Sequence, residues 1–176
     1  MNKWLMLMSV LGLMLLLVAC GEPKANQPGI TEISYKEMMK KFENYETFWV
    51  VTLDAEPKLI KEQQVVELFD KGLKKQGIAA YYVNIHQLSE EEKASLRTDY
   101  LHPFMSNGPV RKWEVETSGL VYVENGGVIQ MSGMPNFSPI VIARGDAHET
   151  EVNKTISKQL QRMGEYGLTY ELVPQQ

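Results

Sequence analysis

Two uncharged runs of β-branched and aromatic residues, Thr47–Leu53 and Ile78–Ile85, lie on either side of one segment of helical length. Each run has the length and composition of a buried strand. Pro57 suits the first turn of the helix between them, and Gly77 suits its end. This order predicts a βαβ unit with parallel strands and a right-handed crossover. The inner face of the single predicted helix carries Val65, Val66, Phe69 and Leu73.

Two capping boxes and one turn motif locate further elements. Ser34 with Glu37 predicts a helix up to about Tyr45, and Ser89 with Glu92 predicts a helix up to about Asp99. Asn125-Gly126 between Gly119–Glu124 and Val128–Met131 predicts a β-hairpin, since a type I′ turn needs positive φ at both central residues. The remaining expected elements are a loop over Leu101–Trp113, a short strand at Pro139–Ala143, a helix over Glu149–Met163 and an edge strand at Leu168–Val173.

The order helix, strand, helix, strand, helix, loop, hairpin, helix resembles the thioredoxin fold without its first strand. The sequence FWVV resembles the central strand of that family, and GLVYVENGGVIQMSG resembles its hairpin. The resemblance runs from about Ile30 to Met163. It implies an α/β fold with a mixed central sheet, a βαβ unit, and a C-terminal hairpin followed by a helix.

The chain departs from the family where thioredoxins carry their chemistry. The junction between central strand and helix reads Asp54-Ala55-Glu56-Pro57-Lys58-Leu59, with no Cys-x-x-Cys motif. Thr117-Ser118-Gly119 stands where the family has a cis-proline. The resemblance therefore implies the fold without the oxidoreductase activity.

The first 21 residues have the parts of a secretion signal. Lys3 precedes a 15-residue apolar run from Trp4 to Val18, and the chain's single cysteine follows small Ala19. The tetrad Leu17-Val18-Ala19-Cys20 resembles the lipobox of bacterial lipoproteins. That resemblance implies a diacylglycerol group on Cys20 and cleavage before it. The alternative is an uncleaved N-terminal anchor helix, which also places the rest of the chain outside the cytoplasm.

These features divide the chain into a signal peptide (1–19), a lipid attachment site and extended tether (20–29), and one globular domain (30–176). The expected location is the outer face of the bacterial cytoplasmic membrane, because Gly21 follows the cysteine. Removal of Lys3 with the signal changes the net charge from −4 to −5. This mild acidity argues against nucleic acid as a partner, since phosphate contacts need a basic surface. A mature chain with no free thiol also excludes disulfide exchange and thiolate catalysis.

Candidate site residues follow the strand ends. In open α/β sheets, ligands bind beyond the carboxyl ends of the strands. Asp54 and Glu56 follow the first predicted strand, His86 follows the second, and the thioredoxin-like topology would bring Ser118 near them. Carboxylates and an imidazole can perform acid–base chemistry or bind a metal. The alternative is that the carboxylates only favour a helix start and that His86 is a solvated loop residue.

The leading hypothesis is a non-enzymatic binding or accessory module that is tethered to the membrane and binds an unidentified protein or peptide. The alternative is a metal-dependent or acid–base hydrolase that uses Asp54, Glu56 and His86. No motif for a cofactor, a phosphate loop or a zinc site is found, so no cofactor and no metal are assigned. The loop Leu101–Trp113, with Tyr100, Phe104 and Trp113 near it, is a plausible contact surface, because aromatic residues gather at binding hot spots. The alternative is that these rings are core residues.

Overall fold

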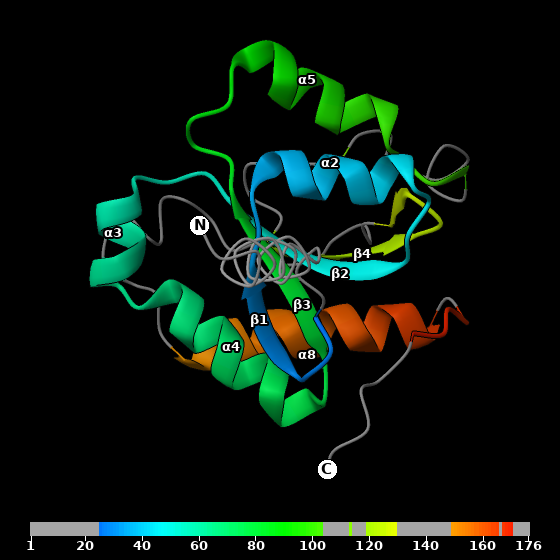
Figure 1. Ribbon diagram of the computed structural model, residues 1–176. Helices are drawn as coiled ribbons and strands as arrows, with labels where there is room; N and C mark the ends of the chain where they lie inside the picture. Colours follow the sequence, from blue (N-terminus) through cyan, green and yellow to red (C-terminus); the bar gives the residue numbers. More distant parts are fainter. Residues whose placement is uncertain (1–24, 104–112, 114–118, 130–148, 166, 171–176) are drawn as a thin grey trace, which may run out of the picture.

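The computed structural model describes residues 25–103, 113, 119–129, 149–165 and 167–170. Within them it has five strands and five helices (Figure 1). The elements are β1 (Gly29–Glu32), α2 (Tyr35–Glu43), β2 (Phe48–Leu53), α3 (Pro57–Glu62), α4 (Val65–Gln76), β3 (Ala79–Asn84), α5 (Glu90–Asp99), β4 (Gly119–Glu124), β5 (Gly127–Ile129) and α8 (Glu149–Glu165).

The strands form one mixed sheet in the order β1-β3-β2-β4-β5. Strands β2 and β3 are parallel neighbours, with Val50 opposite Tyr81, which confirms the predicted βαβ unit. Strand β4 runs antiparallel to β2 and forms a hairpin with β5. The chain is therefore an α/β protein whose architecture is compatible with the thioredoxin-like fold.

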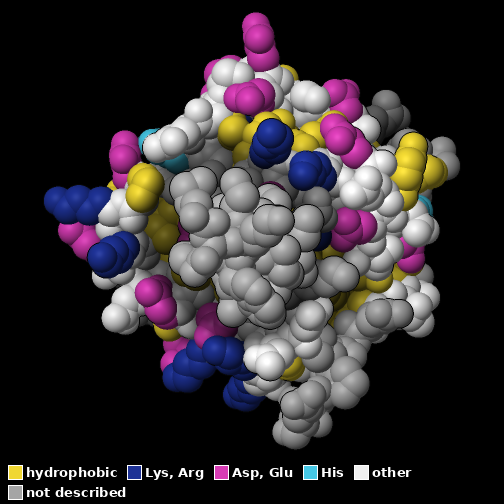
Figure 2. Space-filling model, viewed as in Figure 1, with side chains coloured by type: hydrophobic (Ala, Val, Ile, Leu, Met, Phe, Trp, Pro, Cys, Tyr) yellow, Lys and Arg dark blue, Asp and Glu magenta, His cyan; other side chains and the backbone are white. Residues whose placement is uncertain are grey.

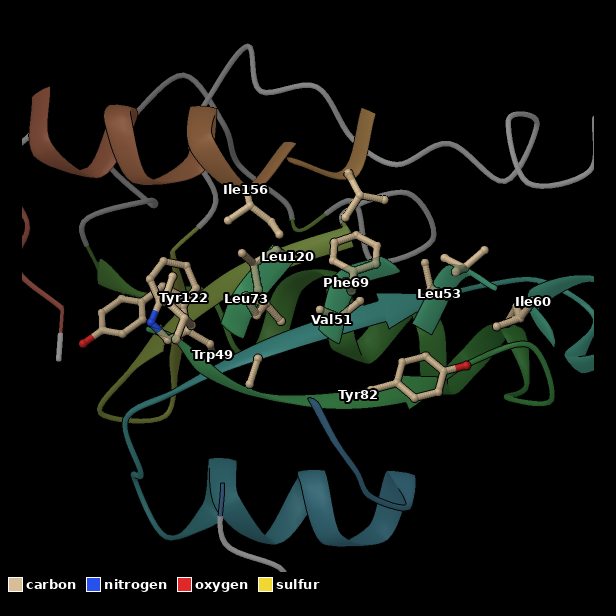
Figure 3. Close-up of a cluster of buried hydrophobic side chains, with 14 of the residues drawn as sticks. Trp49, Val51, Leu53, Ile60, Phe69, Leu73, Tyr82, Leu120, Tyr122 and Ile156 are labelled. Atoms are coloured by element: carbon tan, nitrogen blue, oxygen red, sulfur yellow. The ribbon is translucent and has the colours of Figure 1, made fainter. Parts of the chain in front are cut away.

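Helices cover both faces of the sheet (Figure 1). All six residues of the central strand β2 are buried, because its side chains alternate between two hydrophobic clusters. The cluster toward α4 and α8 contains Trp49, Val51, Phe69 and Ile156 (Figure 3). The cluster toward α2 and α5 is formed by Met38, Phe42, Phe48, Val50, Tyr81, Leu96 and neighbouring side chains.

The local signals place the element ends as predicted. Both capping boxes form, with the Ser34 and Ser89 hydroxyls accepting from the amides three residues later. Gly77 ends α4 in the left-handed conformation at φ 69°. Asn125 and Gly126 have φ values of 49° and 72°, which is the backbone that a type I′ hairpin turn requires.

The structure corrects the sequence interpretation at three places. The first strand exists: Gly29–Glu32 pairs in parallel with β3, so the domain begins before Ile30. The helix predicted between β2 and β3 is two helices, since Gln64 takes the left-handed conformation at φ 51° between α3 and α4. Residues 168–170 belong to no strand, although an edge strand was expected to begin there.

A side chain of α4 occupies one backbone donor on β1, the strand at one edge of the sheet. The amide of Ile30, which points away from β3, donates to Asp70 Oδ1 at 2.9 Å. Asp70 is itself paired with Lys74 Nζ at 2.6 Å. The edge strand therefore offers a neighbouring chain one backbone donor fewer.

Several expectations fall on residues that the structure does not describe. They are the signal peptide with Cys20, the aromatic Phe104, Thr117 and Ser118, the strand expected at 139–143, and the remainder of the expected last strand. Among the helices that are described, none combines the length and the apolar character that crossing a membrane requires.

Candidate functional site

A cluster of charged side chains lies where β2 and β3 end. The helices that follow these two strands leave on opposite faces of the sheet, because α4 packs in one hydrophobic cluster and α5 in the other. Such a divergence opens a crevice between the carboxyl ends of adjacent parallel strands. Asp54 and Glu56 follow the end of β2, His86 follows the end of β3, and the three side chains meet beyond these strand ends.

His86 lies between the two carboxylates. Its Nδ1 is 3.0 Å from Asp54 Oδ1, and its Nε2 is 3.1 Å from Glu56 Oε1. An ionised carboxylate only accepts hydrogen bonds, so both ring nitrogens carry a proton when both contacts form. The hydrogen bonds to Asp54 and then Glu56 raise the pKa of His86, since they stabilise the imidazolium form.

Asp54 has a second cationic partner that sequence reasoning missed. Lys93 Nζ, from the second turn of α5, lies 2.7 Å from Asp54 Oδ2, and the Lys93 side chain is only 8% exposed. Burial by itself raises the pKa of Asp54, but the hydrogen bonds from Lys93 and His86 outweigh it and lower that pKa. One carboxylate therefore joins a buried lysine to the half-exposed histidine.

Asn84 fixes the two turns that carry these groups. Its Nδ2 donates to the carbonyl of Ala55 at 3.0 Å, and its Oδ1 accepts from the amide of His86 at 3.1 Å. The amide of Ile85 also donates to the carbonyl of Leu53, which continues the pairing of β2 and β3 past the strand ends. The spacing between Asp54 and His86 is consequently set by backbone contacts as well as by their own ion pair.

A groove of about 490 Å³ adjoins the cluster. It lies at the same end of the sheet, and its floor includes the buried Tyr82, whose pKa is raised by that burial and secondarily by Glu32. Its lining mixes apolar side chains with amides and with charges of both signs. The lining residues are Glu32, Pro57, Ile60, Lys61, Val66, Glu67, Tyr82, Asn84 and Gln87.

For Trp113, the structure supports the core alternative and not the contact surface. Trp113 is completely buried in the cluster beneath α2 and α5, 6.3 Å from the ring of Phe42. Tyr100 also packs against Phe42, at 4.8 Å between ring centroids. These two rings stabilise the core, and Phe104 lies outside the described residues.

The structure thus brings Asp54, Glu56 and His86 together, whereas Ser118 lies outside the part of the chain that it describes. Within the described ranges, no group of three or more His, Cys, Asp or Glu side chains is arranged to hold a metal ion. Comparison with protein-family models, curated protein sequences and solved structures gave no significant match. The assignment of function therefore depends on the chemistry of this chain's own residues.

Proposed function

We propose that this protein is a bacterial lipoprotein, held on the outer face of the cytoplasmic membrane, whose globular domain is a non-catalytic binding or accessory module. The observation that carries the binding role is the engagement of both His86 nitrogens by carboxylates. A general base or metal ligand needs a lone pair on an imidazole nitrogen. Both His86 nitrogens are instead directed at carboxylate oxygens, at 3.0 and 3.1 Å, and this geometry supports a binding surface over hydrolysis.

The anchor follows from the lipobox at Cys20. The Cys20 sulfur forms a thioether bond to the glyceryl carbon of a membrane phospholipid. The phosphate headgroup leaves with the bonding electron pair, and the thiol proton is released. Water then cleaves the Ala19–Cys20 peptide bond. The mature chain keeps no thiol, and thiol–disulfide exchange requires an attacking thiolate.

The groove beside His86 is the surface that we assign to the partner. Its combination of apolar side chains and amides suits an extended peptide, whose main chain needs hydrogen bonds while its side chains need apolar contacts. On the face shown in Figure 2, acidic and basic side chains are interspersed outside the grey area. This distribution supports a protein or peptide partner and argues against nucleic acid.

The anchor is tested with Cys20→Ala in the full-length chain. We expect the wild-type protein to sediment with membranes and to carry the mass of a lipid. The variant should keep its signal peptide and lack that mass. A wild-type protein recovered unlipidated from the medium would contradict the anchor.

The binding role is tested by placing a photo-crosslinking residue at Lys61 or Gln87, which line the groove, and at Lys158 on α8 as the matched control. We expect a discrete crosslinked product from the two groove positions and none from Lys158. The hydrolase alternative is tested by assaying the purified full-length protein against ester, amide and phosphate substrates. Turnover that disappears in His86→Gln would overturn the non-catalytic proposal.

A further inference from the structure

The residue at which the described chain begins is bound to the domain. The amide of Ala25 donates to the hydroxyl of Tyr81 at 3.1 Å, and Ala25 packs against the cluster beneath α2 and α5. It also lines a small hollow together with Thr47 and Ala79, which stand where β2 and β3 begin. The chain therefore enters the domain at the amino end of these strands, opposite the end that carries His86.

The length of chain before Ala25 limits how far this end can stand from a lipid on Cys20. Five residue steps separate Cys20 from Ala25. Fully extended, they span at most about 17 Å. The six-residue strand β2 is itself about 20 Å long. The amino end of the sheet is thus held within about 17 Å of the anchor, whereas the His86 end lies about 20 Å, one strand length, from that amino end.

An exposed aromatic side chain lies at the same end. Tyr45, in the turn between α2 and β2, is 75% exposed, the one large hydrophobic side chain among the described residues that is strongly exposed. Glu46, the residue that follows Tyr45, accepts a hydrogen bond at its carbonyl from the amide of Gly126 at the tip of the hairpin. Tyr45 therefore lies beside the hairpin tip. Tyrosine combines an apolar ring with a polar tip, which suits the interface between lipid and water.

One of the cations at this end, Lys41, is buried and paired. Lys41 is almost fully buried, with its Nζ 3.1 Å from Glu46 Oε2 and 4.6 Å from the centre of the Tyr81 ring. It is not available to bind an anionic headgroup. Together with a net charge of −5 for the mature chain, this pairing favours contact through Tyr45 and the lipid anchor over electrostatic adhesion.

We propose that the mature protein stands on the bilayer with the amino end of its sheet toward the lipid, Tyr45 at the interface, and the groove beside His86 directed away from the membrane. The proposal rests on the lipid attachment at Cys20 proposed above. It names the bilayer surface as the partner of the amino end, and it leaves the groove accessible to an extracytoplasmic protein or peptide.

The orientation is tested in vesicles of neutral phospholipid that carry the full lipidated protein. Because Cys20 is a thioether there, a cysteine introduced at Glu43 or at Gln87 is the only thiol. Both positions are exposed, at the amino and carboxyl ends respectively. Each is labelled with a fluorophore, and quenching by spin-labelled lipid is measured. We expect quenching at least several-fold stronger at residue 43 than at residue 87.

The outcomes separate the anchor from the orientation. A protein that does not float with the vesicles would overturn the lipid anchor and the orientation together. A protein that floats but is quenched equally at both positions, or more strongly at residue 87, would overturn the orientation alone. Tyr81→Phe removes the hydroxyl that accepts from Ala25 and should reduce the contrast between the two positions. An unchanged contrast would contradict the role of this hydrogen bond.

Discussion

The two ends of the sheet each contain an almost fully buried lysine, but they use it differently. At the amino end, Lys41 is 3% exposed and pairs with Glu46, which is 37% exposed and five residues away in the sequence. At the carboxyl end, Lys93 is 8% exposed and pairs with Asp54, which is 17% exposed and 39 residues away. The first pair closes a local turn, whereas the second joins α5 to the end of β2.

The comparison shows how one domain can have an ion pair that is independent of pH at one end and a pH-dependent cluster at the other. The Lys41 cluster contains lysine, glutamate and tyrosine, which do not ordinarily titrate near neutral pH. Burial by itself lowers the pKa of Lys41, but the contacts with Glu46 and Tyr81 outweigh it and raise that pKa. The Lys93 cluster includes His86, and histidine is the residue type that ordinarily titrates nearest to neutral pH; the contacts with Asp54 and Glu56 raise the pKa of His86. Only the second cluster therefore couples its geometry to pH.

The largest expected difference between the ends comes from Lys93→Met compared with Lys41→Met. Without Lys93, the poorly exposed Asp54 keeps only His86 as a charged partner, and the free energy of unfolding should fall by about 3 kcal/mol. Without Lys41, Glu46 can still be hydrated, so the loss should be about 1 kcal/mol. Urea unfolding of the full chains in mild detergent measures both values. Equal losses would show that the two ends are energetically equivalent.

A smaller loss of stability is expected at the amino end when a side chain is added at Gly126, in the turn of the hairpin. Gly126 has φ 72°, and a Cβ atom there would lie 2.6 Å from the carbonyl oxygen of Phe42. Gly126→Ala should therefore cost about 2 kcal/mol, since both the left-handed conformation and the close approach oppose a side chain. Gly164→Ala in α8 is the matched control, because no atom lies within 4 Å of its Cβ position. Thermal melting should show a lower Tm for the first and an unchanged or higher Tm for the second.

The smallest expected effect is the pH dependence of the unfolding free energy, which should differ between the two ends. The folded-state pKa of His86 is raised, so its contribution to stability is present below its unfolded value of about 6.5 and is lost as pH rises through the folded value. The difference in unfolding free energy between wild type and His86→Gln should be under about 1 kcal/mol, because the ring is partly exposed. It should be greatest at mildly acidic pH, where the imidazolium is charged and Asp54 is still ionised, and vanish in alkaline solution. The difference in unfolding free energy between wild type and Lys41→Met should stay constant over the same pH range. A difference that changes with pH would contradict the contrast between the two ends.

The sequence predicted the parts of the fold whose causes are local. Capping boxes, the Asn-Gly turn and long apolar strands each depend on residues within a few positions of one another, and all were found. Strand β1 was missed because four residues with one strongly apolar side chain, Ile30, give no periodic pattern; its pairing with β3 stabilises it instead. The break at Gln64 was missed because glutamine ordinarily favours a helix, so its identity gives no signal for the left-handed backbone that it adopts.

The candidate site was predictable in part for the same reason. The rule that strand ends face a shared crevice was sufficient to bring Asp54, Glu56 and His86 together. Lys93 was missed because it follows Glu90-Glu91-Glu92, a pattern typical of a solvated helix surface, while its partner is 39 residues away. The sequence left Trp113 open between a contact surface and the core, since a loop position does not reveal burial.

The hydrogen bond from the Ile30 amide to Asp70 affects how neighbouring copies of the chain can interact. Proteins confined to a bilayer meet one another in two dimensions, at local concentrations far above those of the same number of molecules free in solution. Under those conditions an open strand edge would tend to join with the edge of an adjacent molecule, and sheets would grow along the membrane. The Asp70 carboxylate occupies the Ile30 amide on that edge. If the chain is anchored as proposed, this single side chain of α4 would help each molecule to remain separate from its neighbours.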